Sequence, residues 1–168
     1  MVIKAIPTTY NGKKFRSLLE ATWAEWLDQN NIKWVYEFHD IQLSDGTRYI
    51  PDFYLDEVDT FIEVKGFMDR LEKPYKLIQE LKKESQNWPD NGTMVLLAGP
   101  IGTFYNIDEA YYGGFHLVKC SKCGCVSIVT RLGSYSCRAC GEDNGDHDII
   151  ANITAAQKPL KWLFLERD

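Results

Sequence analysis

Two short cysteine repeats constrain the fold of this chain more than any other feature of its sequence. The motif C-x-x-C-G occurs as CSKCG at residues 120–124 and as CRACG at residues 137–141. The intervening 13 residues and the paired thiolates suit one tetrahedral Zn²⁺ ion, and each glycine allows the turn that aims backbone N–H groups at sulfur. We therefore expect a zinc ribbon whose ligands are Cys120, Cys123, Cys137 and Cys140.

The predicted zinc site is completed by protein ligands, so its role is expected to be structural. An iron–sulfur cluster on the same cysteines is the main alternative, and two disulfides are a more remote one. The run VSIVTRLGSYS (126–136) predicts a hairpin between the repeats, with Gly133 in its turn. Cys125 is expected in a strand, and His147 is expected to be a loop residue rather than a ligand.

The rest of the chain alternates between helical and extended patterns. Apolar residues at helical spacing predict a helix over 15–31, ended by Asn30-Asn31, and Pro74 suits the first turn of a second helix over 72–88. Ser44-Asp45-Gly46 predicts a tight hairpin turn, and residues 100–114 are expected to be mostly loop. Strands are expected at 32–38, 41–43, 48–55, 60–66, 93–99 and 114–120, with the apolar run TMVLLAG (93–99) at the centre of a sheet.

This order of elements predicts an α/β fold with a mixed central sheet flanked by helices. A core over residues 1–115 is expected to be followed by the zinc ribbon over 116–148. The segment 149–168 is expected to pack back on the core, with a short helix in TAAQKPLKWLFLERD (154–168).

Charged residues interrupt two of the apolar strands. Asp52 lies in the strand before TFIEVKG (60–66), which carries Glu63 and Lys65 on one face because side chains alternate along a strand. Asp52 can lie opposite them across a hairpin, which would bring two carboxylates and an ammonium together. Carboxylates that converge in this way repel unless a divalent cation binds them, and hard oxygen ligands suit Mg²⁺. A surface ion pair with a solvated Asp52 is the alternative.

A further acid falls on the buried row of the first predicted helix. Glu20 shares that row with Trp23 and Leu27, so its carboxylate points towards the core and needs a partner. The partner could be a metal site under the helix or Arg16, one turn earlier.

These residues resemble the motifs of the PD-(D/E)xK nuclease superfamily: Pro51-Asp52, then Glu63-Val64-Lys65, with an acid on the preceding helix. The blocks FRSLLE, IKWVYE, YIPDFYL and FIEVKG are similar in order and spacing to the phage junction-resolving endonuclease I group. The resemblance covers about residues 15–66 and implies a restriction-endonuclease-like fold. It also implies a site in which Asp52, Glu63 and the Val64 carbonyl bind catalytic Mg²⁺ (or Mn²⁺), Lys65 is the catalytic lysine and Glu20 is an additional catalytic acid.

The resemblance leaves two points open. Glu37 falls in a matching block without assigned chemistry, and a structural partner for a nearby base is one interpretation. The junction-resolving enzymes are domain-swapped, with the helix acid supplied by the other subunit. Here the tight turn in IQLSDGTRY (41–49) favours strands that fold back within one chain.

The implied function is Mg²⁺-dependent hydrolysis of DNA phosphodiester bonds by an endonuclease of phage or prokaryotic DNA processing, selective for branched, flapped or nicked DNA. A single-strand nickase or exonuclease is the alternative enzyme, and a non-catalytic DNA- or protein-binding module with a zinc ribbon is the alternative of another class. The chemistry of the predicted metal site does not distinguish DNA from RNA.

Charge and targeting signals complete the expectations. The net charge is −5, yet residues 1–19 and 116–140 each carry +4, and the ribbon also carries Tyr135, expected to be exposed. The ribbon is therefore either a DNA-contacting arm or a staple for an insertion. A homodimer or a delivering protein partner is compatible with the acidic total. The N-terminus has no signal-peptide core and no run is long enough to span a membrane, so we expect a cytoplasmic protein, in the host cytoplasm if phage-encoded.

Overall fold

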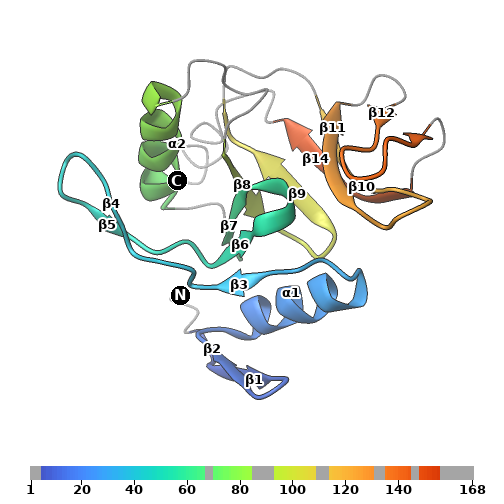
Figure 1. Cartoon of the computed structure of the whole chain (residues 1–168). Helices are drawn as coiled ribbons and strands as arrows, with labels where there is room; N and C mark the ends of the chain where they lie inside the picture. Colours follow the sequence, from blue (N-terminus) through green and yellow to red (C-terminus); the bar gives the residue numbers. More distant parts are fainter. Residues whose placement is uncertain are drawn as a thin grey trace.

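The computed structural model has one large mixed sheet with helices on both sides (Figure 1). It describes residues 5–66, 70–84, 93–108, 114–130, 135–144 and 148–155. The helices are α1 (Leu18–Gln29), α2 (Glu72–Glu84) and the short 3-10 helix η1 (Asp56–Val58). The strands are β1 (Thr8–Tyr10), β2 (Lys13–Phe15), β3 (Val35–Tyr36), β4 (Ile41–Gln42), β5 (Arg48–Tyr49), β6 (Phe53–Leu55), β7 (Thr60–Val64), β8 (Met94–Ala98), β9 (Thr103–Asn106), β10 (Phe115–Lys119), β11 (Val126–Thr130), β12 (Tyr135–Ser136), β13 (Asp143–Asn144) and β14 (Asp148–Ala155).

Eight strands form the central sheet in the order β11-β10-β14-β9-β8-β7-β6-β3. The pairs β7–β8 and β9–β14 are parallel, and the other neighbours are antiparallel. The predicted α/β class with a mixed sheet is confirmed. Strand β8 lies inside the sheet and is covered on both faces, as its wholly apolar sequence predicts.

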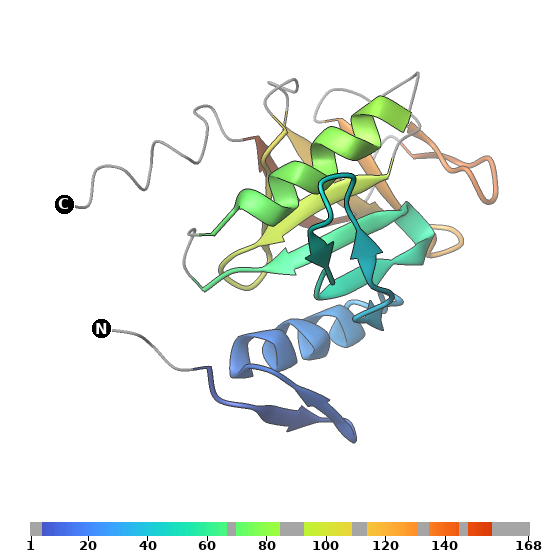
Figure 2. The same ribbon diagram turned by 90° about the vertical axis from the view of Figure 1, so that its left-hand side faces the viewer.

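The two helices cover opposite faces of this sheet (Figure 2). On one face, α1 packs Trp23 and Leu27 against sheet residues that include Ile62 and Leu96. On the other face, the core contains Leu77 of α2, with residues of β7 and β8. The indole N–H of Trp23 donates to the buried carbonyl of Gly99 at 3.1 Å, which fastens α1 to the end of β8.

The first helix is shorter than its apolar pattern predicts. Phe15 ends β2 and packs in the core under α1, and the helix begins at Leu18 with Ser17 as its N-cap. The Ser17 hydroxyl accepts from the Glu20 N–H at 3.1 Å, which satisfies a helix-terminal donor. The predicted end is confirmed, because Asn30 caps the C-terminus.

Strand β7 shows the alternation that its sequence predicts. Ile62 and Val64 belong to the core under α1, whereas Phe61 belongs to the core on the α2 side. The β6–β7 hairpin pairs Phe53 with Ile62, which brings Asp52, just before β6, to the end of β7.

The Asp-Gly turn forms the predicted hairpin β4–β5, in which Gly46 adopts a φ of +83°. The hairpin returns within the same chain and is tied to α2. The Ser44 N–H and hydroxyl donate to one carboxylate oxygen of Glu80 at 2.5 and 2.6 Å, and Lys76 pairs with Asp45 at 2.8 Å.

Two predictions on the C-terminal half differ from the structure, and a third falls almost wholly outside the described residues. The expected loop over 100–114 contains β9 (Thr103–Asn106). The expected pairing inside 126–136 is wrong, since β11 pairs with β10 and β12 pairs with β13; Gly133 lies outside the described residues. The expected helix in 154–168 begins with two residues that end β14, and the rest lies outside the described residues.

Strand β14 lies between β9 and β10, so three strands from residues 115–155 extend the central sheet. A parallel β9 partner and an antiparallel β10 partner satisfy both of its edges. None of the helices in the described part of the chain is long and apolar enough to span a membrane.

Candidate functional site

The four cysteines of the C-x-x-C-G repeats form one compact group. Their sulfur atoms all lie within 4.8 Å of one another, and no other group of three or more potential metal ligands in the described residues is as compact. The Sγ–Sγ distance is 3.8 Å between Cys120 and Cys140 and 3.6 Å between Cys123 and Cys137. This group could bind a metal such as zinc.

The sulfur spacing matches a single tetrahedral ion. A Zn–S bond of about 2.3 Å gives an S–S edge of about 3.8 Å, because the edge of a tetrahedron is about 1.63 times its centre-to-vertex distance. A disulfide would require about 2.05 Å between sulfur atoms. In an iron–sulfur cluster the four thiolates are divided among two or four iron atoms, which spreads the group of four sulfur atoms more widely than one shared ion does.

Each repeat forms the turn of its own hairpin. The Cys120 N–H donates to the Cys125 carbonyl at the base of the β10–β11 hairpin, and the Cys137 N–H donates to the Glu142 carbonyl between β12 and β13. Gly124 and Gly141 adopt φ values of +73° and +72°, which non-glycine residues rarely adopt. N–H groups of Cys140 and Ala139 donate to the Cys137 sulfur and lower its pKa.

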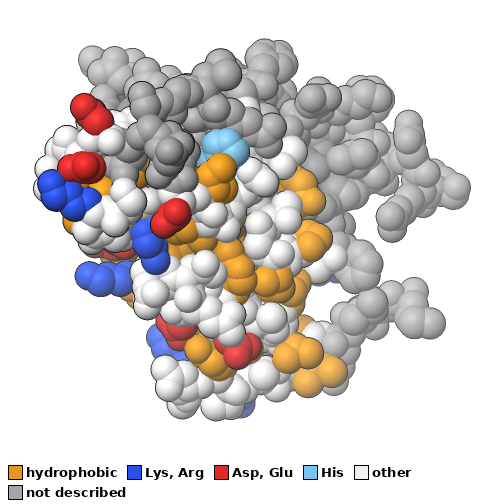
Figure 3. Space-filling view, turned by 90° about the vertical axis from the view of Figure 1, so that its right-hand side faces the viewer, with side chains coloured by type: hydrophobic (Ala, Val, Ile, Leu, Met, Phe, Trp, Pro, Cys, Tyr) orange, Lys and Arg blue, Asp and Glu red, His pale blue; other side chains and the backbone are white. Residues whose placement is uncertain are grey.

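The described cations of this region are engaged within the protein. The Lys119 ammonium donates to the Asn30 carbonyl at 2.7 Å, and Lys122 pairs with Glu142 at 3.0 Å. The Arg138 guanidinium donates to the Val126 carbonyl at 3.1 Å and to the Glu57 carbonyl. On this side of the molecule, the Lys and Arg side chains of the described residues form no continuous stripe (Figure 3).

Three other residues of the ribbon were singled out in the sequence. Tyr135 was expected to be exposed, but it is half-buried, and burial raises the pKa of its buried hydroxyl. Cys125 directly precedes β11 and is not part of the four-cysteine group. His147 lies outside the described residues. The described cations of the cysteine region therefore all contact protein atoms.

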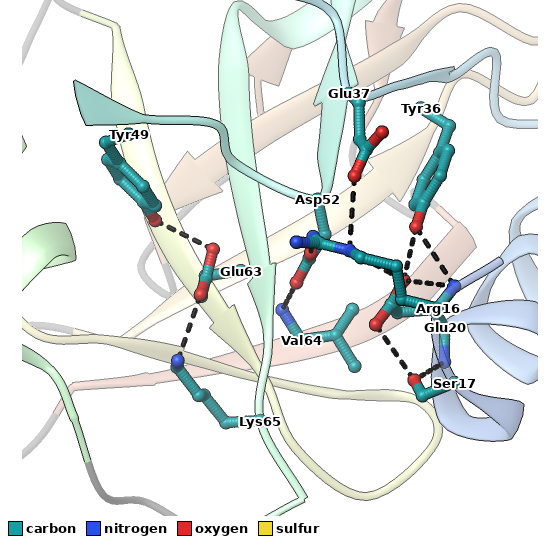
Figure 4. Close-up of polar contacts among 10 residues, drawn as sticks. All are labelled: Arg16, Ser17, Glu20, Tyr36, Glu37, Tyr49, Asp52, Glu63, Val64 and Lys65. Carbon is teal, nitrogen blue, oxygen red and sulfur yellow. Dashed lines mark hydrogen bonds and ion pairs between the residues drawn. The ribbon is translucent and has the colours of Figure 1, made fainter. Parts of the chain in front are cut away.

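The second candidate site lies at the end of β7, where Asp52 and Glu63 each have two partners (Figure 4). Asp52 is buried, and its carboxylate accepts the Val64 N–H at 2.7 Å and a hydrogen bond from the Arg16 guanidinium. Glu63 accepts the Tyr49 hydroxyl at 2.8 Å and pairs with the Lys65 ammonium at 2.9 Å. The alternative of a solvated Asp52 with a surface ion pair does not describe these side chains.

The carboxylate of Glu20 is satisfied at the start of α1. It accepts the Ser17 hydroxyl at 2.9 Å, the Tyr36 hydroxyl at 2.5 Å and the Arg16 N–H at 3.3 Å. These donors explain how an acid is tolerated on the buried row of the helix. Of the two partners considered for Glu20, Arg16 lies close to it, with 3.8 Å between the Arg16 Nε and a Glu20 oxygen.

Arg16 joins the acids of this region. Besides Asp52 and Glu20, its Nε lies 3.1 Å from a carboxylate oxygen of Glu37. Glu37 is thus the partner of a nearby base, which was one interpretation of its matching block. Its φ of +49° and its N–H bond to the Asp52 carbonyl at 2.9 Å bring the carboxylate to this position as β3 ends.

The electrostatics of the acids favour an added positive charge. Burial, together with the charges of Glu63 and Glu20, raises the pKa of Asp52 to about 7, although the Val64 N–H and Arg16 lower it. Burial and the hydrogen bond to Glu20 raise the pKa of Tyr36 to about 12. The carboxylate oxygens of Asp52 and Glu63 are hard donors of the type that Mg²⁺ prefers.

A cleft of about 390 Å³ opens beside these residues. It is lined by Arg16, Asp40, Arg48, Tyr49, Ile50, Glu63 and Lys73. The cleft therefore has three cationic side chains next to one of the predicted metal ligands.

The residues missed by the sequence analysis are those that position the acids. The Tyr36 and Tyr49 hydroxyls donate to Glu20 and Glu63, and neither contact was predicted. Arg16 was predicted only as a possible partner of Glu20, and its contacts with Asp52 and Glu37 were missed. The one signal present was S-x-x-E at Ser17–Glu20, typical of a helix N-terminal capping box.

Comparisons of this chain with protein families, with curated proteins and with solved structures found no match.

Proposed function

We propose that this chain is a Mg²⁺-dependent endodeoxyribonuclease that hydrolyses phosphodiester bonds at the end of β7. The observation that carries the proposal is the gathering of Asp52, Glu63 and Lys65 at one strand end beside a cleft with three cations. A buried acid with a raised pKa beside a cleft is typical of functional sites, and Asp52 is such an acid.

In this proposal, Asp52, Glu63 and the Val64 carbonyl hold Mg²⁺ or Mn²⁺. The chemistry that the bound ion supplies is positive charge at the phosphate and activation of water. Lys65 presents its ammonium 2.9 Å from a Glu63 oxygen, where it can orient the attacking water or stabilise charge on the phosphate. Tyr49 fixes the other Glu63 oxygen from the opposite side.

In this proposal Glu20 has a structural role rather than the role of a catalytic acid that the resemblance implies. Its oxygens are occupied by Ser17, Tyr36 and Arg16, so it acts here by holding Arg16 and the start of α1. The four cysteines hold a structural Zn²⁺ that fastens the β10–β11 hairpin to the β12–β13 hairpin. We assign this region the staple role because its described cations bind protein atoms.

The test is cleavage of matched labelled substrates with Mg²⁺ and with EDTA. The set contains a duplex, a nicked duplex, a flap, a four-way junction, a DNA single strand and an RNA single strand of the same sequence. We expect Mg²⁺-dependent cleavage of DNA, abolished by Glu63→Gln without loss of the folded circular dichroism spectrum. The cations of the cleft would bind any phosphate backbone, so this experiment identifies the preferred DNA structure.

Each other outcome favours a different function. Paired cuts at the junction alone would indicate a junction-resolving dimer. Cleavage only of single strands or flaps would indicate the nickase or exonuclease alternative. Absence of cleavage of any substrate by folded, zinc-loaded protein would overturn the proposal in favour of a binding module.

A further inference from the structure

Arg16 pairs with Asp52, one of the two carboxylates of the proposed metal site, and with two neighbouring acids. It lies in the two-residue connection between β2 and α1, and its guanidinium reaches Asp52, Glu37 and Glu20 (Figure 4). The Asp52 oxygen that it contacts is the one not used by the Val64 N–H. A cation bound to that oxygen and the guanidinium would therefore compete for the same lone pairs.

The exposure of the side chains indicates which member of the Arg16–carboxylate cluster can move away from the others. The Arg16 side chain is 57% exposed, whereas the Asp52 and Glu20 side chains are 6% and 11% exposed. Asp52 is held by the backbone of β7, but Arg16 has a long flexible side chain that already lines the 390 Å³ cleft. Moving the guanidinium into this cleft keeps it hydrated and close to Arg48 and Lys73.

The chemistry of the cleft indicates what the released guanidinium would bind. A planar guanidinium binds phosphate through two parallel hydrogen bonds, and two further cations surround the same space. In the structure, the carboxylates of Asp52, Glu37 and Glu20 contact the Arg16 guanidinium. A cation at Asp52 would neutralise the acids and free the donors for a substrate phosphate.

We propose that Arg16 is exchanged between the carboxylate cluster and the substrate phosphate when the divalent cation binds. Arg16 is a substrate-binding residue in this proposal, which rests on the proposed function because it assumes the cation site at Asp52. The exchange makes cation binding and phosphate binding mutually favourable, since the cation releases the group that binds the phosphate.

The test compares two affinities in one pair of variants. Mg²⁺ binding is measured by calorimetry, and binding of a labelled 20-nucleotide single strand is measured by fluorescence anisotropy at saturating Mg²⁺, in a Lys65→Met background that prevents cleavage. We expect Arg16→Gln to bind Mg²⁺ about tenfold tighter and the oligonucleotide about tenfold weaker, with a salt slope reduced by about one. A purely structural role would weaken both.

The matched control is Arg48→Gln. It removes the same charge from the same cleft, but Arg48 pairs with Asp40 rather than with the carboxylate cluster. We expect this variant to leave Mg²⁺ affinity unchanged while weakening oligonucleotide binding.

If Arg16→Gln does not fold, Arg16→Lys tests the same exchange. Lysine retains the charge but has a single donor centre, so we expect it to bind Mg²⁺ more tightly than wild type and to keep most of the oligonucleotide affinity. Unchanged or weaker Mg²⁺ binding in both variants would overturn the exchange, as would unchanged oligonucleotide affinity in Arg16→Gln. If wild-type protein neither binds Mg²⁺ in an Asp52-dependent way nor cleaves DNA, the proposed function fails as well.

Discussion

At the scale of single residues, the charged side chains of the β6–β7 strands are accounted for by their donors. Burial of a carboxylate is costly unless hydrogen bonds or opposite charges compensate for the lost water. Asp52 has the Val64 N–H and Arg16, and Glu63 has Tyr49 and Lys65. The Glu63 carboxylate is thus held from two sides, by the Tyr49 hydroxyl and by the Lys65 ammonium.

Tyr49→Phe tests how much this support contributes. Tyr49 is 3% exposed and donates to Glu63 at 2.8 Å, so its loss leaves a half-buried carboxylate short of one donor. We expect the free energy of unfolding to fall by about 1–3 kcal/mol, measured by urea denaturation without divalent cations. We also expect slower cleavage at saturating Mg²⁺, because Glu63 is held less firmly.

Tyr54→Phe is the control for this prediction. Tyr54 donates to Asp59 at the same distance of 2.8 Å, but in an exposed turn. Water can replace the lost donor there, and we expect less than about 1 kcal/mol of destabilisation. Equal effects of the two substitutions would contradict a special role of the Tyr49–Glu63 bond.

At the scale of elements, the cysteine repeats act as turns of two hairpins whose strands have different partners. The β10–β11 hairpin belongs to the central sheet, whereas β12 and β13 form a separate two-stranded sheet. The four sulfur atoms connect the two, and the Arg138 bond to the Val126 carbonyl adds a second connection. The metal would therefore fasten the small sheet to the large one.

Cys123→Ser compared with Cys125→Ser tests this arrangement. Cys123 belongs to the four-cysteine group, and Cys125, two residues later, does not. We expect Cys123→Ser to lose bound zinc, measured by mass spectrometry of metal content. Its melting temperature should fall by roughly 10 °C, from a loss of about 3 kcal/mol or more and about 2–4 °C per kcal/mol for a chain of this size.

Cys125→Ser should retain one zinc per chain and a melting temperature close to that of the wild type. Zinc retention by Cys123→Ser would contradict the four-thiolate site. Iron in place of zinc in the wild-type protein would restore the cluster alternative.

At the scale of the whole molecule, strand β14 decides how the two halves of the chain depend on each other. It pairs with β9 of the expected core and with β10 of the expected ribbon region, and its buried Ile153 lies in the core under α1. The central sheet and the cysteine hairpins therefore share strands. A boundary at residue 115 divides the central sheet.

We expect a fragment of residues 1–115 not to fold by itself. It lacks β10, β11 and β14, so the edge of β9 would be unpaired and part of the α1 core would be exposed. Far-UV circular dichroism and two-dimensional NMR of the fragment should show an unfolded or aggregated chain. A dispersed NMR spectrum together with DNA cleavage by the fragment would show that the core is independent.

The sequence by itself determined the helices, strands and turns that are specified by residues close together in the chain. Apolar residues at helical spacing predict α1, Pro74 predicts the start of α2, and the continuous apolar run at 93–99 predicts β8. The Asp45-Gly46 pair predicts the β4–β5 turn, and cysteine spacing predicts the four-sulfur group. These features follow from helix periodicity, strand alternation and the geometry of short turns, which act over a few residues.

Only the tertiary structure decided which strands pair and which donors reach the acids. The pairing of β11 with β10, the position of β14 and the strand at 103–106 depend on contacts between residues far apart in the chain. Likewise, Arg16, Tyr36 and Tyr49 reach Asp52, Glu20 and Glu63 through the folding of separate elements. Hydrogen bonds of this kind are selected by the packing that brings the groups together, and that packing cannot be inferred from the spacing of the residues in the sequence.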